Sequence, residues 1–366
     1  MIPAIPASRD NLLGWDKSEL RHLAAACEEP QFRGTQLFRN LYGHRRCDFA
    51  ECTELPAHFR HLLSSRYRVD YPEVKARIAS RDGSVRYLLS LEDGESVETV
   101  YMPEEGRVTL CVSSQVGCAV NCHFCFTAML GVKRNLEAGE IVGQIFAVAA
   151  AQQFSSPTPL NVVFMGMGEP LLNLASVMKA VRILADPDGI AIPLRRITIS
   201  TAGITPKIQD LAREAVRPKL AVSLNASTEE QRTALMPLNR KYPLSELLAA
   251  CRAFPLGPRE RLTFEYVLLD GMNDTDSDAR RVAALLRGIR AKVNLIPYNS
   301  GPDLPYQPSP LRRVLGFQKV LQERHIPAFI RISRGQDIMA ACGQLRLSGM
   351  ESGTAAAEVV RPVSLG

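Results

Sequence analysis

Four cysteines lie within fifteen residues of this 366-residue chain, in the sequence CVSSQVGCAVNCHFC at residues 111–125. Cys118, Cys122 and Cys125 form a C-x3-C-x2-C pattern, and Cys111 precedes them by seven residues. Three thiolates with the C-x3-C-x2-C spacing can each ligate one iron of a 4Fe–4S cluster and leave its fourth iron open for a ligand.

A zinc site is the alternative explanation of the same residues. Structural zinc is held tetrahedrally by four ligands on short loops. Cys111 lies on a predicted strand, and His123 stands between two proposed ligands with no room to fold back. The spacing therefore favours a cluster held by three cysteines and leaves Cys111 outside it.

A carboxylate ends the next predicted strand, in FMGMGEP at residues 164–170. The glycines allow the backbone to approach a ligand, and Glu169 stands at the tip. A Rossmann phosphate loop would need a third glycine where Leu171 stands. A surface turn would also explain the acid, but strand ends of an α/β barrel form its catalytic rim, so we expect Glu169 to contact a ligand.

Short polar residues end three further predicted strands: Ser200, then Ser223 with Asn225, and Asn299. Each could simply cap the helix that follows. Because the carboxyl ends of parallel strands meet at one edge, the common placement also predicts ligand contact.

Parallel strands are predicted by the pattern from residue 137 onward, where short β-rich apolar runs alternate with longer amphipathic helices. With the strand before the cysteines there are about six β/α units, fewer than the eight of a closed barrel. We therefore predict an α/β fold with a partial (β/α)6 barrel that carries the cysteine loop after its first strand.

Two other patterns precede the barrel. Residues 1–80 are predicted to form a helical accessory module. Residues 84–115 alternate with period two around the turn signals Asp93-Gly94 and Glu105-Gly106, which predicts a short antiparallel β-meander. The predicted domains are residues 1–80, residues 81–347 with a barrel core at about 104–337, and a loose tail at 348–366.

Charge is mildly positive, with 44 Lys and Arg against 38 Asp and Glu. The excess is concentrated between residues 33 and 68, where arginines form either a solvated helical face or a surface that contacts the phosphates of a large polyanion. The sequence contains no apolar run of ~18 residues that would predict a membrane span, and we identify no signal peptide. We expect a cytoplasmic protein with reduced thiols.

The remaining cysteines are isolated in the sequence. Cys342 lies in SRGQDIMAACGQL, 217 residues after Cys125. A lone cysteine is more often a small buried hydrophobe, which we predict for Cys27 and Cys251. Cys47 and Cys52 flank a turn and receive no role.

Over its length the chain resembles the RlmN/Cfr family of radical S-adenosylmethionine (SAM) RNA methyltransferases. The resemblance rests on ETVYMPEEGRVTLCVSSQVGCAVNCHFCFTAMLGVKRNL, GMGEPLLN, RRITISTAG, AVSLNAS, LIPYN and RGQDIMAACGQL, in this order. FRGTQLFRNLYGHRRCDFAECTELP resembles the family's accessory helical domain, so the likeness runs from about residue 10 to 346. TLCVSSQVGCAV and DIMAACGQL are most similar to the RlmN branch.

The resemblance implies a mechanism that uses the isolated cysteines and two SAM molecules per turnover. One SAM methylates Cys342, and the second, bound at the cluster, is cleaved to a 5′-deoxyadenosyl radical that takes hydrogen from this methyl group. The carbon radical adds to carbon 2 of an adenine, and Glu98 accepts the ring proton. Cys111 then attacks Cys342, forms a disulfide and releases the product.

The same resemblance implies the partners and the SAM contacts. The substrate would be 23S rRNA, with tRNA as a second candidate, and the electron donor a flavodoxin or ferredoxin; the chain would act as a monomer. Asn225 departs from the pattern, since many members have His there, but an amide can still bond a ribose hydroxyl. The implied SAM contacts are Gly168, Glu169, Ser200, Ser223, Leu224, Asn225 and Asn299.

Two alternative functions stay open at this point. One is Cfr-like methylation at carbon 8 of adenosine, which uses the same two cysteines. The other is a non-catalytic iron–sulfur or zinc protein that binds RNA through its arginine-rich module. Mere binding has no use for Cys111, Cys342 and Glu98, which favours the enzyme.

Overall fold

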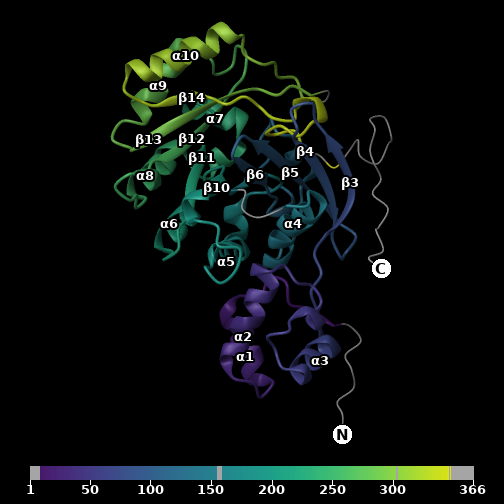
Figure 1. Cartoon of the computed structure of the whole chain (residues 1–366). Helices are drawn as coiled ribbons and strands as arrows, with labels where there is room; N and C mark the ends of the chain where they lie inside the picture. The colour runs from purple at the N-terminus through teal and green to yellow at the C-terminus, as the bar shows by residue number, and fades with distance from the viewer. Residues whose placement is uncertain (1–8, 155–158, 302–303, 346, 348–366) are drawn as a thin grey trace.

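A computed structural model describes residues 9–154, 159–301, 304–345 and 347 (Figure 1). The tail expected at 348–366 lies outside the described residues. Within the described ranges, no helix combines the length and the apolar character needed to cross a membrane.

A helical module forms the N-terminal part of the described chain, at the bottom of Figure 1. At Gly34 a Cβ would lie 2.3 Å from the carbonyl oxygen of Leu20, so glycine lets the second helix pack closely on the first. The module consists of α1 (Lys17–Ala26), α2 (Gln31–Phe38), the π-helical turn η1 (Arg39–Gly43), the 3-10 turn η2 (Phe49–Glu51) and α3 (Ala57–Arg66). The predicted helices are thus confirmed as far as Arg66.

The prediction that this helical structure continues to residue 80 is wrong. β2 (Tyr67–Arg68) pairs in parallel with β1 (Asp10–Asn11), and β3 (Glu73–Ala79) is the edge strand of the large sheet. Ala76 and Ile78 of β3 are buried while their neighbours are more exposed, as expected for a strand with one face on the core.

Ten strands form one sheet, in the order β14-β13-β12-β11-β10-β9-β6-β5-β4-β3. β3, β4 (Val85–Ser90), β5 (Ser96–Glu104) and β6 (Arg107–Cys111) are antiparallel, which confirms the predicted meander. From β6 to β14 every pair is parallel, through β9 (Leu160–Phe164), β10 (Ile197–Thr201), β11 (Lys219–Ser223), β12 (Leu262–Leu268), β13 (Ala291–Pro297) and β14 (Ala328–Ile330). β6 and β9–β13 are the six strands of the predicted partial barrel.

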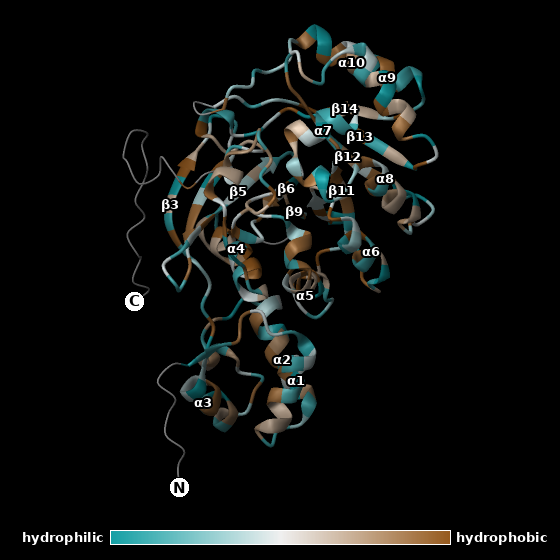
Figure 2. Cartoon of the chain, turned by 180° about the vertical axis from the view of Figure 1, so that it is seen from behind, coloured by the Kyte–Doolittle hydropathy of each residue, from teal (hydrophilic) through white to brown (hydrophobic). Residues whose placement is uncertain are grey.

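Helices cover the outer face of the parallel strands (Figure 1). They are α4 (Ala138–Ala151), α5 (Leu174–Ala185), α6 (Thr205–Arg213), α8 (Leu244–Ala253), α9 (Asp276–Leu285) and α10 (Leu311–Glu323). Figure 2 shows brown hydrophobic and teal hydrophilic residues alternating along α8 and α10, typical of helices with one face on a core. A short helix, α7 (Glu229–Leu235), which the sequence pattern did not indicate, precedes α8.

The strand register determines which side chains face the interior of the barrel. Leu110, Val162 and Ile197 are aligned on adjacent strands and fully buried against the helices. The next residue along each strand points the opposite way, so Cys111 lies on the inner face. The same register places Ser200, Ser223, Glu265 and Asn294 there.

A closing segment, residues 331–345, crosses the open side between the two edge strands β14 and β3. The Gly335 amide donates to Asp82 in the β3–β4 turn at 3.0 Å. Asp337 accepts from the Ser80 hydroxyl at 2.6 Å and from the Arg81 amide at 3.1 Å. Burial alone would raise the pKa of Asp82, but hydrogen bonds from the Gly335 and Ser84 amides lower it to about 2.

Candidate active site

The loop with the three clustered cysteines is closed at its base by a small two-stranded sheet. β7 (Gln115–Gly117) pairs antiparallel with β8 (Val132–Asn135), and the Cys118 amide donates to the Gly131 carbonyl at 2.7 Å. Gly117 has φ +80°, and a Cβ there would lie 1.8 Å from the Gly131 oxygen. The loop can therefore close this tightly only with glycine at 117.

The thiols of Cys118, Cys122 and Cys125 are partly buried and lie near one another. Burial, together with nearby Cys125 and Glu169, raises the pKa of Cys118 to about 12. Burial and the two neighbouring thiols raise the pKa of Cys122 well above its ordinary value. Three thiolates here need a cation to hold them, which bound iron supplies.

No three His, Cys, Asp or Glu side chains among the described residues are arranged to hold a single metal ion. A 4Fe–4S cluster places each thiolate on a different iron, so its three ligands need not converge on one point. The donor set therefore fits a cluster held by Cys118, Cys122 and Cys125.

Glu169 is fixed at the end of β9 by two amide donors. One carboxylate oxygen accepts from the Leu171 amide at 3.0 Å and the other from the Ala202 amide at 2.7 Å. Gly168 before it has φ +99°, and a Cβ there would lie 2.7 Å from the Gln115 nitrogen. Burial raises the pKa of Glu169 to about 7. A desolvated carboxylate beside the cysteine loop suits a ligand that carries an amino group.

The other predicted SAM contacts lie at neighbouring strand ends, but they do not all offer side chains. Ser200 and Ser223 are half-buried on the inner face. Asn225 has φ 54°, a conformation that Asn tolerates well. Its amide oxygen accepts from the Val267 amide at 2.9 Å and its nitrogen lies 3.4 Å from the Met236 sulfur. The protein itself thus already uses the Asn225 side chain.

Cys342 is held above the cysteine loop by the closing segment. The Phe126 amide donates to the Gly343 carbonyl at 2.8 Å, and the Thr127 hydroxyl to the Leu345 carbonyl at 2.7 Å. Asn299, the last predicted SAM contact, donates to the Cys342 carbonyl at 3.3 Å. Cys342 is an exposed residue, and desolvation by the groups around it raises the pKa of its thiol.

Cys111 and Glu98 both lie on the inner face of the barrel. Cys111 is buried, and burial together with the nearby Cys342 thiol raises its pKa. Val100 pairs with Cys111, so Glu98, two residues earlier on β5, faces the same side. Glu98 is buried 3.5 Å from an Arg86 nitrogen, which also donates to the Met339 carbonyl in the closing segment.

Several residues of the site carry no motif. Glu265 lies on the inner face of β12, accepts a 2.8 Å bond from Asn294 and is close enough to influence the Cys342 thiol. A single acid inside the apolar strand LTFEYVL could have drawn attention to it. Arg86 and the fully buried Arg232 gave no comparable signal.

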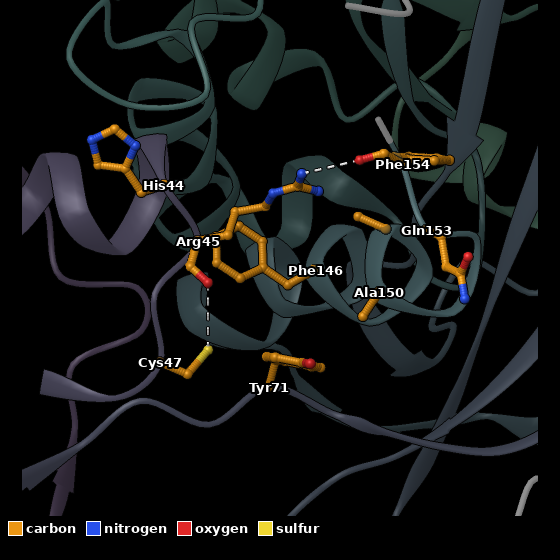
Figure 3. A pocket seen from close by; sticks show the side chains of 9 residues that line it. His44, Arg45, Cys47, Tyr71, Phe146, Ala150, Gln153 and Phe154 are labelled. Carbon is orange, nitrogen blue, oxygen red and sulfur yellow. Dashed lines mark hydrogen bonds between the residues drawn. The ribbon is translucent and has the colours of Figure 1, made fainter. Parts of the chain in front are cut away.

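The cysteines without a proposed role lie elsewhere. Cys251 is buried in α8, as predicted for a small hydrophobe, whereas Cys27 is only partly buried. Cys47 lines a cavity of about 330 Å³ between the helical module and α4 (Figure 3). Figure 3 shows Tyr71, Phe146 and Arg45 around it; none of the residues predicted for the site lines this cavity.

Two family models match the chain. Residues 112–283 match the radical SAM superfamily, and residues 10–69 match the N-terminal domain of ribosomal RNA large subunit methyltransferases.

Similar proteins cover nearly its whole length. A probable dual-specificity RNA methyltransferase RlmN from Koribacter versatilis (strain Ellin345) is 50% identical over 335 residues, 87% of this chain and 96% of that protein. A dual-specificity RNA methyltransferase RlmN from Syntrophobacter fumaroxidans (strain DSM 10017 / MPOB) is 49% identical over 328 residues, 89% and 95% of the two chains. The crystal structure of a radical SAM methyltransferase from Sphaerobacter thermophilus has 44% identity and a TM-score of 0.86, covering 92% of this chain and 99% of that one.

Proposed function

Because the chain belongs to the RlmN family of radical SAM methyltransferases, we propose that it methylates carbon 2 of an adenosine in 23S rRNA and in tRNA. The family's cofactors are a 4Fe–4S cluster and SAM. The observation that best supports the proposal is the convergence of Glu98, Cys111 and Cys342 beside the cysteine loop. Glu98 and Cys111 lie on two neighbouring strands and Cys342 lies in the closing segment. A protein that only bound RNA would have no use for these three residues.

Cys118, Cys122 and Cys125 would hold the cluster, which when bound supplies the electron that cleaves one SAM. Glu169 would accept a hydrogen bond from the amino group of SAM, because its carboxylate is buried and fixed by the Ala202 and Leu171 amides. Gly168, Ser200, Ser223, Leu224, Asn225 and Asn299 would complete the SAM site, with Asn225 contributing its backbone.

Cys342 would carry the methyl carbon from a first SAM to the RNA. Its side chain is exposed, as a group that must meet both SAM and adenine has to be. The bonds from Phe126, Thr127 and Asn299 hold its segment against the cysteine loop. A carrier held in this way meets the adenine without a diffusive step.

Glu98 and Cys111 would complete the reaction. Once carbon 2 is bonded to the Cys342 methylene, the radical adduct must lose one electron and one proton to restore the aromatic ring. The electron would return to the oxidised cluster, and the carboxylate of Glu98, which Arg86 orients, would take the ring proton. Cys111 then attacks the Cys342 sulfur: the S–S bond forms as the S–C bond breaks, and the released methylene takes a proton equivalent to the one that the Cys111 thiol loses and becomes the methyl group. Burial raises the pKa of the Cys111 thiol, which keeps it protonated and unreactive before this step.

The remaining parts of the proposal concern partners. The arginines between residues 33 and 68 would contact RNA phosphates from the helical module. A flavodoxin or ferredoxin would donate the electron, and the chain would act as a cytoplasmic monomer. The boundary predicted at residue 80 moves to a point before β3, because this strand belongs to the large sheet. The catalytic part would then run from β3 to about residue 347, with its core at 104–337.

A Cys111→Ala variant tests the proposal. With the reconstituted cluster, SAM, reductant and an rRNA fragment, it should accumulate a covalent protein–RNA adduct through Cys342. The matched control is Cys251→Ala, a buried cysteine in α8, which should form free product. Full product yield without an adduct in Cys111→Ala would remove Cys111 from the mechanism.

Nucleoside mass spectrometry of the product separates the alternatives. The proposal requires 2-methyladenosine in rRNA and in tRNA. 8-Methyladenosine would instead identify Cfr-like chemistry, and stable zinc without iron in anaerobically purified protein would favour a binding protein.

A further inference from the structure

Arg232 on α7 is the largest fully buried side chain in the described part of the chain, with an exposure of 0%. A buried cation is costly unless its charge and its donors are compensated. Among the described residues no carboxylate forms an ion pair with it, and its donors bond neutral oxygens instead. A cation kept here at such a cost invites a functional explanation.

The guanidinium joins the ends of two adjacent barrel strands. It donates to the Ala202 carbonyl after β10 at 2.6 Å, and to the Ser223 and Leu224 carbonyls at the end of β11 at 3.2 and 3.3 Å. Ala202 is also the residue whose amide holds Glu169. One side chain therefore bonds the backbone of two proposed SAM contacts, Ser223 and Leu224, and of Ala202, whose amide holds a third, Glu169.

A second element keeps this guanidinium in place. Asn239, in the 3-10 turn η6 (Pro237–Arg240), accepts from Arg232 at 3.0 Å and itself donates to Glu229 at 2.7 Å. Replacing Asn239 would loosen the guanidinium and leave its charge.

The same helix packs against the cysteine loop. The His123 amide donates to the Leu235 carbonyl of α7 at 2.9 Å, and Cys122 packs on the apolar cluster that contains Leu235. Arg232 lies one helical turn before Leu235, so the face of α7 that meets the cysteine loop also carries its charge, and Cys122 is among the groups that this charge reaches. Glu229 and Cys251 are the other titratable groups that influence Arg232.

We infer that Arg232 is a positioning residue that fixes the SAM-binding strand ends and also raises the reduction potential of the cluster held by Cys122. This inference rests on the proposed cluster and SAM sites. An added electron makes a thiolate-bound cluster more negative, and a nearby desolvated cation stabilises that reduced form.

Two variants separate the two roles. Arg232→Lys is compared at the lowest pH at which the protein stays folded, because a buried lysine loses its proton far more readily than an arginine. There it keeps the charge, but its single nitrogen cannot bond the carbonyls of both strands in the same geometry. SAM binding to the oxidised protein should weaken by about 10- to 100-fold, while the reduction potential stays near that of the unmodified protein. Arg232→Met loses both features, so its potential should also become more negative.

The measurements are equilibrium dialysis with SAM and a redox titration followed by electron paramagnetic resonance. Arg313→Lys is the matched control: Arg313 bonds Asp270 and Asp274 beyond β12 and should change neither quantity. An unchanged potential in Arg232→Met would overturn the electrostatic role. If Arg232→Lys bound SAM as tightly as the unmodified protein, the positioning role would be overturned.

If Arg232→Met does not fold, Asn239→Ala together with Arg232→Lys decides the question. Asn239→Ala should weaken SAM binding without changing the potential; a change in potential alone would contradict the inference. Neither measurement uses RNA, so a failure of the proposed RNA methylation would be recognised separately by its product assay.

Discussion

Replacing Glu169 with glutamine should remove a defined part of the pH dependence of folding. Glu169 is 3% exposed, and its carboxyl group accepts from two backbone amides. Burial nevertheless raises its pKa from 4.5 to about 7. Glu169 thus binds its proton more tightly in the folded protein than in the unfolded chain.

The sign and size of the effect follow from this difference. Between pH 4.5 and about 7 the folded protein holds the proton that the unfolded chain has lost, so stability falls as pH rises through this window. Each tenfold change in proton affinity is worth about 1.4 kcal/mol, which gives a loss of about 3 kcal/mol above pH 7.

Urea unfolding of the cluster-free protein under reducing conditions, at pH 5 and pH 8, measures this loss. The unmodified protein should lose about 2.5 kcal/mol more than Glu169→Gln between these two pH values, because pH 5 already lies above the unfolded pKa of 4.5. Glutamine offers one acceptor to two amide donors, but this cost is the same at both pH values and cancels. Glu246→Gln, on the exposed face of α8, is the control. An equal pH dependence in Glu169→Gln and the unmodified protein would refute the reasoning.

Three further substitutions test the site. Gly168→Ala places a Cβ 2.7 Å from a backbone nitrogen at φ +99°, so it should destabilise the protein by about 1–3 kcal/mol and weaken SAM binding, by thermal unfolding and dialysis. Thr127→Val removes the 2.7 Å bond to Leu345 and should speed alkylation of Cys342. Arg86→Met removes the ion pair of a buried carboxylate and should cost about 3–5 kcal/mol in urea unfolding; changes under 1 kcal/mol would contradict that pairing.

The order of the barrel strands was predictable from sequence because each parallel strand is a short apolar run followed by an amphipathic helix. β3 was missed, although Val74, Ala76 and Ile78 alternate with polar residues, because the segment follows directly on the helical module. Only pairing with β4 decides its conformation, and that pairing is a tertiary interaction.

At the site, too, features set by local spacing were predictable from sequence, and contacts between distant segments were not. The three clustered cysteines lie on one loop, so their spacing alone predicts a cluster. The meeting of Cys111 with the closing segment depends on the completed fold and was expected only from family resemblance. Arg232 lies in the polar sequence STEEQRTALM, typical of an exposed helix, and its burial follows from the path of the β11–α8 connection.

The closing segment, residues 331–345, has two structural roles at once. The hydrogen bonds from Gly335 and to Asp337 join the free margin of the sheet to the stretch of chain that bears Cys342. The segment that completes the open side of the barrel is therefore also the segment that carries Cys342. A substitution that moved this thiol would change how the barrel closes, so the two features cannot vary independently.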